Sequence, residues 1–388
     1  MLRNAFLDRV RHVERLCSIA LAMIKTTDIS NSKLKDGTST GPNIIEEVSG
    51  GGHVDGDQWP LWLSEEDRQL LQSESVKADA VVAEDGSGDY TTVAAAVEAA
   101  PSNNEKRCVI RIKTGVYREN VRVMGHRKNI MVVGDGRLHT FITGNRSVAN
   151  GWSPFQSATV GVISEGFLAR DITFENTGGS GNGAAVALRV GSDKSAFYRC
   201  GFSSYERTLH VQSKRQFFAD CFITGNRDII YGNSAAFFQG SDIRVRQQFL
   251  FIDNIVTAQS RSDQNQDTGI VIQNSRIEAS DLDHWLYSTT YLGRPEREFA
   301  RSVVMQSYIS DLLRPDGWQG WGVTFELDNL TFREYQNRGM GANTKRRVKW
   351  KSFKVITDPE EAEQFTTGPF IDGGSWLKGT GFPFKLDL

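Results

Sequence analysis

The chain has 388 residues, which is long enough for one large domain or two smaller ones with a sizeable core. Its formal net charge is −2 at pH 7, whereas a protein that binds nucleic acid or a membrane surface usually has a one-sided basic charge. No run of about 18 apolar residues occurs, so we expect neither nucleic acid nor a membrane as a partner.

The N-terminal region divides into two predicted segments before the main domain. Residues 1–26 carry an apolar run at helical spacing, but Asp8 and Glu14 precede it, which fits a signal peptide poorly. This spacing predicts an amphipathic helix over 1–26. Residues 27–78 are largely polar and rich in Gly and Ser, so we interpret them as a linker. The remaining residues, 79–388, form the predicted main domain.

An Ala-rich helix is predicted near the start of the main domain. The segment 87–104 reads "SGDYTTVAAAVEAAPSNN", and its helical part should stop at Pro101. A helix at this place would cover the open edge of the first sheet layer.

Short apolar runs separated by Gly, Asn, Asp and Ser fill the rest of the domain, which is typical of many short strands. The runs "SAFYRC" (195–200), "RQFFADC" (215–221) and "AAFFQGSD" (235–242) recur about every 20 residues. A period of this length, with one apolar cluster per unit, predicts stacked coils that bury their inner faces on one another. Because no long helices are predicted here, we favour an all-β parallel β-helix over a helical solenoid.

The four cysteines, Cys17, Cys108, Cys200 and Cys221, have no spacing that matches a zinc site, so we expect no metal. Cys200 and Cys221 occupy equivalent places on adjacent coils. A strand spacing of about 4.8 Å would bring their Cα atoms within disulfide range. We expect them to be close enough to bond, with two stacked buried thiols as the alternative.

Many ordered motifs then identify a family. They include "VVAEDGSGDYTTVAAAV", "GVYRENV", "VGDGR", "ALRVGSDKSAFYRC", "RQFFADCFITGN", "YLGRP", "REYQN" and "GGSWL". In this order they resemble the plant pectin methylesterases, the pectinesterases, from about residue 60 to the C-terminus. The resemblance implies a right-handed, single-stranded parallel β-helix. Residues 1–56 resemble the stub of the inhibitor-like helical pro-region that many of these enzymes carry.

The resemblance also implies partners and a location. Pectin, as homogalacturonan, is the implied substrate, and a pectinesterase inhibitor protein is a further implied partner. The implied protein is an extracellular monomer of the cell wall that uses no cofactor, although the sequence has no convincing signal peptide.

Family members hydrolyse the methyl ester of galacturonate units with side chains alone. One Asp attacks the ester carbonyl, a second Asp protonates the departing methanol, two Gln stabilise the oxyanion, and an Arg orients the nucleophile. The motif "DIIYGN" places Asp228 at the nucleophile position, and "LGRP" places Arg294 at the orienting position, which also contacts substrate.

Three catalytic positions differ from the family pattern. Ala184 and Glu206 stand where the family has the oxyanion Gln residues, and Arg207 stands where it has the proton-donating Asp. An arginine has a pKa above about 12, so it cannot act as a general acid near neutral pH. Loss of general acid catalysis alone should slow the reaction about 100- to 10,000-fold.

Substrate-binding positions differ as well. Glu296 replaces a substrate-stacking Trp, and Ser153 with Pro154 replaces a Thr pair. The resemblance places Tyr231 and Trp318 among the substrate-binding residues. We expect one shallow groove to hold Asp228, Arg294, Arg207 and Glu206 together.

Three functional hypotheses follow from these residues. The first is a pectinesterase whose ester hydrolysis is lost or severely impaired. The second is an active pectinesterase that uses Asp228 with Glu206 as a substitute acid. The third is a non-catalytic binder of pectin or of a cell-wall protein.

Overall fold

The structure, a computed structural model, describes residues 77–179, 181, 183–246, 253–280, 289–320, 322 and 327–388. The predicted N-terminal helix and nearly all of the predicted linker lie outside these residues. Among the described helices, none is both long and apolar enough to cross a membrane.

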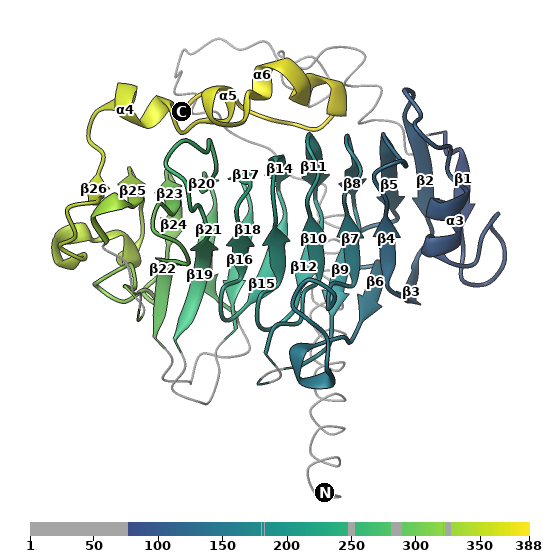
Figure 1. Cartoon of the computed structure of the whole chain (residues 1–388), viewed down its shortest axis with the longest axis horizontal. Helices are drawn as coiled ribbons and strands as arrows, with labels where there is room; N and C mark the ends of the chain where they lie inside the picture. Colours follow the sequence, from purple (N-terminus) through teal and green to yellow (C-terminus); the bar gives the residue numbers. More distant parts are fainter. Residues whose placement is uncertain are drawn as a thin grey trace, which may run out of the picture. The chain divides into compact units, whose positions relative to one another are not determined.

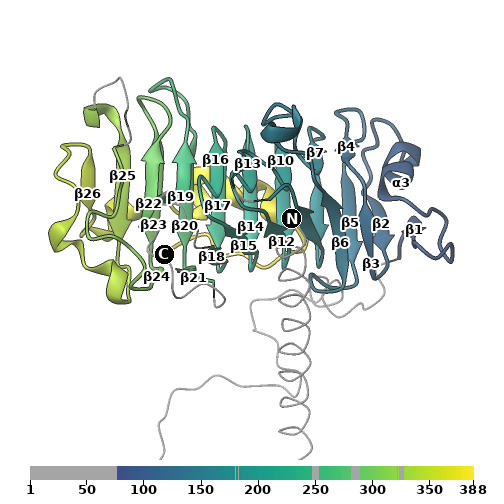
Figure 2. The same ribbon diagram turned by 90° about the horizontal axis from the view of Figure 1, so that it is seen from below.

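Three parallel sheets make up the domain (Figures 1 and 2). The first, sheet A, contains in order β1 (Ala80–Val82), β2 (Cys108–Ile112), β5 (Ile130–Gly134), β8 (Leu168–Arg170), β11 (Ser195–Tyr198), β14 (Arg215–Ala219), β17 (Ala235–Gln239), β20 (Gly269–Gln273), β23 (Arg301–Met305), β25 (Thr331–Tyr335) and β26 (Phe353–Val355). Sheet B contains β3 (Gly115–Arg118), β6 (Thr140–Gly144), β9 (Thr173–Asn176), β12 (Gly201–Ser203), β15 (Phe222–Gly225), β18 (Asp242–Val245), β21 (Arg276–Ala279) and β24 (Tyr308–Ile309). Sheet C contains β4 (Val121–Val123), β7 (Val160–Val162), β10 (Leu188–Val190), β13 (Leu209–Val211), β16 (Ile230–Gly232), β19 (Asn254–Gln259) and β22 (Thr290–Pro295).

From β2 to β22 each coil contributes one strand to each sheet, in the order A, B, C, as β11, β12 and β13 do. Every strand pair is parallel, and the partner of a strand is its counterpart one coil later. The all-β parallel β-helix predicted from the repeat is therefore confirmed.

Stacked aromatic rings fill the interior between the sheets. Phe197, Phe218 and Phe238 pair in register on adjacent sheet A strands, and all three are fully buried. Their rings lie nearly parallel, with centroids 4.8 Å apart for the first pair and 4.5 Å apart for the second. Replacing one such ring by Ala typically costs about 3–5 kcal/mol. The aromatic repeat in the sequence is thus the inner stack of the coil.

The predicted Ala-rich helix is present as α3 (Val93–Ala99) and covers the first coil. The Thr92 side chain accepts a hydrogen bond from the backbone of the first turn. The two carboxylate oxygens of Glu119 accept from the backbone N–H groups of Val93 (2.7 Å) and Ala94 (2.8 Å). A carboxylate at this end complements the positive helix terminus, so the "GVYRENV" motif fixes the covering helix.

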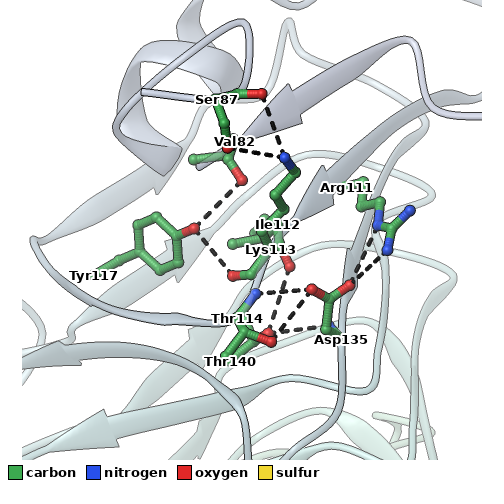
Figure 3. Close-up of polar contacts among 9 residues, drawn as sticks. All are labelled: Val82, Ser87, Arg111, Ile112, Lys113, Thr114, Tyr117, Asp135 and Thr140. Atoms are coloured by element: carbon green, nitrogen blue, oxygen red, sulfur yellow. Dashed lines mark hydrogen bonds and ion pairs between the residues drawn. The ribbon is translucent and has the colours of Figure 1, made fainter. Parts of the chain in front are cut away.

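Polar contacts among β2, β3 and the residues that follow β2 and β5 join the motifs of the first coils (Figure 3). The Tyr117 hydroxyl donates to the carbonyl oxygen of Lys113 (3.0 Å). The Asp135 carboxylate accepts from the Thr114 backbone N–H (2.8 Å) and from the Arg111 guanidinium (3.0 Å). These residues belong to "GVYRENV" and "VGDGR" or adjoin them, so the motifs at this end serve packing rather than chemistry.

The C-terminal helices cover the outer face of sheet A. They are α4 (Pro359–Glu363), α5 (Thr367–Ile371) and α6 (Gly373–Trp376). Figure 1 shows them along one side of the strands. Outward-facing Phe217 and Phe237 share a buried cluster with Ile371 and Trp376. The central strands of sheet A are therefore buried on both faces.

No disulfide joins Cys200 and Cys221 in the structure, which has the alternative arrangement of two buried thiols. The two residues do sit one coil apart, but both are free, buried thiols. The next coils have Ser241, Ser275 and Ser307 at the same corner, and each hydroxyl donates to the carbonyl two residues earlier. The two thiols make the same contact, to Tyr198 and to Ala219. They therefore continue a ladder of small donors along this corner.

We expect peptide mapping to find Cys200 and Cys221 unlinked. Burial raises the pKa of both thiols, so neither supplies a thiolate to an oxidant or an alkylating reagent. Mass spectrometry after non-reducing digestion should detect both as alkylated peptides only when the reagent is added in denaturant. A linked peptide from the native protein would contradict this assignment.

Candidate active site

A single row of side chains crosses the outer face of sheet C. In β10, Leu188 and Val190 point into the core, so the middle residue points outward. The strand register aligns the corresponding residue of each strand: Arg122, Gly161, Arg189, His210, Tyr231, Ala258 and Arg294. This row, which we call the sheet C row, is the floor on which the candidate site is built.

Asp228 and Arg207 occupy equivalent turns on adjacent coils, just before β16 and β13. The backbone N–H of Arg207 donates to the carbonyl oxygen of Arg227 (2.9 Å). Both residues have left-handed backbone conformations, with φ of 49° at Asp228 and 60° at Arg207. Asp and Asn adopt this conformation more readily than Arg does, so an aspartate would suit position 207 better.

Arg294, from β22, holds the Asp228 carboxylate in a two-pronged ion pair. Its Nε lies 2.8 Å from Oδ1, and its Nη2 lies 2.5 Å from Oδ2. Only 2% of the Arg294 side chain and 1% of the Asp228 side chain are exposed. Planar bidentate pairs are the strongest carboxylate contacts, so this carboxylate is rigidly oriented.

Arg207 adds a second cation to the same carboxylate. Its Nη2 lies 3.4 Å from Oδ2 of Asp228 and 2.5 Å from Oε1 of Glu296. Burial raises the pKa of Glu296, Arg207 opposes that rise, and Asp228 adds to it. We call Asp228, Glu296, Arg207 and Arg294 the four-charge cluster. The formal charges of its two carboxylates and two guanidiniums sum to zero.

An aromatic pair lies beneath Arg207. The rings of His210 and Tyr231 stack with centroids 4.3 Å apart, and the Arg207 guanidinium sits 4.7 Å from the Tyr231 ring centroid. Burial raises the pKa of Tyr231, whose buried hydroxyl has no hydrogen-bond partner among the described residues. Burial, together with Arg189 and Arg207, lowers the pKa of His210 to about 3. His210 is therefore neutral and carries no charge into the site.

The structure brings three of the four expected groove residues into contact and leaves out Glu206. Among the described residues, the Glu206 side chain has no hydrogen bond or ion pair, although its backbone bridges to Arg227. The carboxylate that joins the cluster is Glu296, for which the sequence indicated only a missing Trp. Ala184 is buried and offers no side-chain donor.

Trp318 lies in the core, which corrects its assignment to substrate binding. It is 1% exposed, and its ring packs against Phe332 with centroids 4.6 Å apart. Its Nε1 donates to Oε1 of Glu334 (3.1 Å). An indole with its face and its N–H both satisfied in the interior cannot stack on a sugar. Ser153 and Pro154, in contrast, are exposed, and Ser153 borders a hollow over the sheet C row.

Sequence reasoning missed the basic part of the sheet C row. Arg122 and Arg189 are the middle residues of three-residue strands, β4 and β10. The pattern that could have revealed these arginines is a basic residue between two apolar residues, because both flanking residues of each strand are buried. It could be recognised only after the coil boundaries were known.

The four-charge cluster holds the Asp228 carboxylate in place. Asp228 lies between two guanidiniums, and Glu296 is the only other carboxyl in the cluster. Within the described parts of the chain, no three His, Cys, Asp or Glu side chains are gathered as metal ligands.

Comparisons with known proteins agree with the architecture. The pectinesterase family profile matches residues 79–374. The whole chain is 56% identical over 395 residues to "Pectinesterase 2" of Arabidopsis thaliana and spans 67% of its length. It is 54% identical over 401 residues to "Pectinesterase/pectinesterase inhibitor 3" of the same species, spanning 68% of that protein. The solved structure of "Pectin methylesterase from Carrot" aligns over 82% of this chain and all of its own, with a TM-score of 0.79 and 54% identity.

Proposed function

This chain belongs to the pectinesterase family and has its right-handed parallel β-helix, and from that premise we propose that it binds pectin along sheet C while hydrolysing methyl esters very slowly. One observation carries the proposal. At the place of the family's proton donor stands Arg207, paired with both Asp228 and Glu296.

The nucleophile itself is restrained. A carboxylate attacks an ester carbon through an oxygen lone pair, and hydrogen bonds to a carboxylate lower its nucleophilicity. Oδ1 of Asp228 accepts from Arg294, while Oδ2 lies near both Arg294 and Arg207. In the family pattern a single arginine orients this group. The second guanidinium therefore stabilises the resting carboxylate without helping the attack.

The later steps lack their catalytic groups. Methoxide is a poor leaving group unless it is protonated, and Arg207 holds its proton too tightly to donate it. The side chains expected to face the developing oxyanion are Ala184, without a donor, and Glu206, which would repel negative charge when ionised. Each missing oxyanion donor slows such reactions about 100- to 1,000-fold.

A second candidate function is favoured by the position of Glu296. Burial raises the pKa of this carboxyl, and Asp228 raises it further. A neutral Glu296 could donate a proton if substrate binding displaced Arg207. The contact between Glu296 and Arg207 favours Glu296 over Glu206 as this substitute acid, because the Glu206 side chain has no hydrogen bond or ion pair among the described residues.

Methanol release from highly methylated pectin tests the proposal. We expect the purified chain to be at least about 100-fold slower than the carrot enzyme, because one catalytic group alone contributes that much. The matched variants are Glu296→Gln and Glu206→Gln. Rapid turnover that Glu296→Gln abolishes would establish the substitute acid instead. If Glu206→Gln abolished it, the alternative with Glu206 would be correct.

A further inference from the structure

The turn that follows β6, between sheets B and C, carries an acceptor sequence for N-linked glycosylation. Asn-x-Ser/Thr, with x other than Pro, is that acceptor, and the chain contains it twice, as "NRS" (145–147) and "NLT" (329–331). Asn145 comes directly after β6 and is exposed. Its backbone carbonyl accepts from Nδ2 of Asn150 (3.2 Å), but among the described residues its side-chain amide has no hydrogen-bond partner. The Asn145 amide is therefore accessible and unused.

The other two residues of this acceptor sequence are held by the fold. Ser147 is 1% exposed, and its backbone N–H donates to Oδ1 of Asn150 (3.0 Å) in a capping box of the 3₁₀ helix η1 (Val148–Asn150). The Arg146 guanidinium lies over the Trp152 ring, 4.1 Å from its centroid. These contacts fix the turn and leave Asn145 at its exposed end. Because Ser147 becomes buried on folding, the acceptor sequence is available to a modifying enzyme only before the domain has folded.

A groove of 460 Å³ on the outer face of sheet B begins at Asn145. It is lined by β3, β6 and β9, which are neighbours at one end of the sheet, and by residues that follow these strands (Figure 1). We call it the sheet B groove. Its volume falls within the range of about 300–1,000 Å³ that is usual for small-ligand sites. It shares no lining residue with the hollow over the sheet C row.

The sheet B groove offers acceptors that suit a neutral sugar. Glu175 points outward from β9, because its neighbour Phe174 is in the core. Oε2 of Glu175 accepts from the Thr143 hydroxyl (2.8 Å), while Oε1 has no partner among the described residues. Nδ2 of Asn120 donates to the Ala158 carbonyl (3.2 Å), and within the same residues its Oδ1 is likewise unpaired. Sugar hydroxyls and the N–H of an N-acetyl group are donors that such oxygens accept from.

We propose that Asn145 carries an N-linked glycan whose first N-acetylglucosamine lies in the sheet B groove. In the transfer, the side-chain amide nitrogen bonds to C1 of the sugar of a lipid-linked oligosaccharide diphosphate. The bond from C1 to the diphosphate oxygen breaks, the lipid diphosphate leaves, and the amide gives up one proton. The inference rests on the proposed function, because a protein that binds pectin reaches the cell wall through the compartment where such glycans are added. It goes further because the glycan covers sheet B and leaves sheet C open.

Site mapping tests the modification, with the full chain directed into the secretory pathway of a eukaryotic host by an added leader. An amidase that releases the glycan in heavy-oxygen water converts the modified Asn into a labelled Asp, which mass spectrometry locates. We expect the label at position 145 and its loss in Asn145→Gln. Ser147→Thr should keep the glycan, and Asn329→Gln should leave the label at 145 unchanged. A label at 329 alone, or at neither position, would overturn the inference.

The rate of the same amidase on the folded protein tests the sheet B groove. A first sugar held there shields the bond at Asn145, so Glu175→Ala should speed release about tenfold, as expected when one hydrogen bond to a charged group is lost. Glu278→Ala is the matched control, because Glu278 lies in the same row of sheet B but outside the groove. It should leave the rate unchanged, and after denaturation all the proteins should react equally. Equal native rates with and without Glu175→Ala would overturn the groove assignment.

Pectin binding before and after release of the glycan separates this inference from the proposed function. Release should leave binding along sheet C unchanged, since the sheet B groove and the hollow over the sheet C row have no residue in common. A chain that binds pectin but has no glycan at Asn145 would overturn this inference alone. A chain that is glycosylated at Asn145 but fails to bind pectin would overturn the proposed function alone.

Discussion

Changing four residues together, Arg207→Asp, Glu206→Gln, Ala184→Gln and Glu296→Trp, is expected to give the chain readily measured pectinesterase activity. The single change Arg207→Asp is expected to achieve little. General acid catalysis contributes about 100- to 10,000-fold and each oxyanion donor about 100- to 1,000-fold. These groups act on one transition state, so restoring one leaves the others limiting.

The four-charge cluster explains why the single change should fail. Arg207→Asp removes a cation that lies against both Asp228 and Glu296. Three carboxyl groups would then share one guanidinium, and like charges at short range raise the pKa of carboxyl groups. Replacing Glu296 by Trp at the same time removes one of these carboxyl groups. It also restores an aromatic surface for the sugar.

Local backbone conformation should accommodate the new aspartate. Position 207 has φ of 60°, which Asp tolerates better than Arg. The fourfold variant should therefore fold at least as readily at this turn as the native chain.

Methanol release by the native chain, the single variant and the fourfold variant provides the measurement. Adding Asp228→Asn to the fourfold variant is the matched control, and it should remove the recovered activity. Circular dichroism would show that each protein is folded. A folded but inactive fourfold variant would mean that the site has changed beyond the positions named here.

Replacing Arg294 by Gln is expected to lower the free energy of unfolding by about 3–5 kcal/mol, because it leaves the buried Asp228 carboxylate without its main partner. The pair is 1–2% exposed, and both prongs of the guanidinium are lost. Arg207, 3.4 Å from the same carboxylate, should keep the loss toward the lower end of that range.

Urea unfolding of the variants checks this expectation. Arg314→Gln breaks an ion pair whose side chains are 44% and 48% exposed, and it should change stability by less than about 1 kcal/mol. Arg294→Gln combined with Asp228→Asn should be less damaging than Arg294→Gln alone, since no uncompensated charge remains. Equal stability of Arg294→Gln and Arg314→Gln would contradict a structural role for the buried pair.

The sequence alone determined the architecture of the domain. The recurrence of Phe197, Phe218 and Phe238 every twenty or so residues follows from the coil length, because each coil must return one ring to the same inner stack. The covering helix at 93–99 was likewise predicted by local composition and the following proline. Ordered motifs located Asp228 and Arg294, which the structure pairs across 66 residues.

Tertiary structure decided which side chains meet. Glu296 pairs with Arg207 across 89 residues, a contact set by the register of β13, β16 and β22 and by no local pattern. The same register left Glu206 outside the cluster.

Burial and orientation decided the remaining differences. Trp318 is a core residue. Its indole N–H donates to Glu334, and its ring packs against Phe332. Cys200 and Cys221 are thiols that donate to the carbonyl two residues earlier, and the Cys221 thiol also reaches the carbonyl of Phe197 on the preceding coil. A sequence specifies strand length and repeat, but the partners of a side chain depend on which coils lie above and below it.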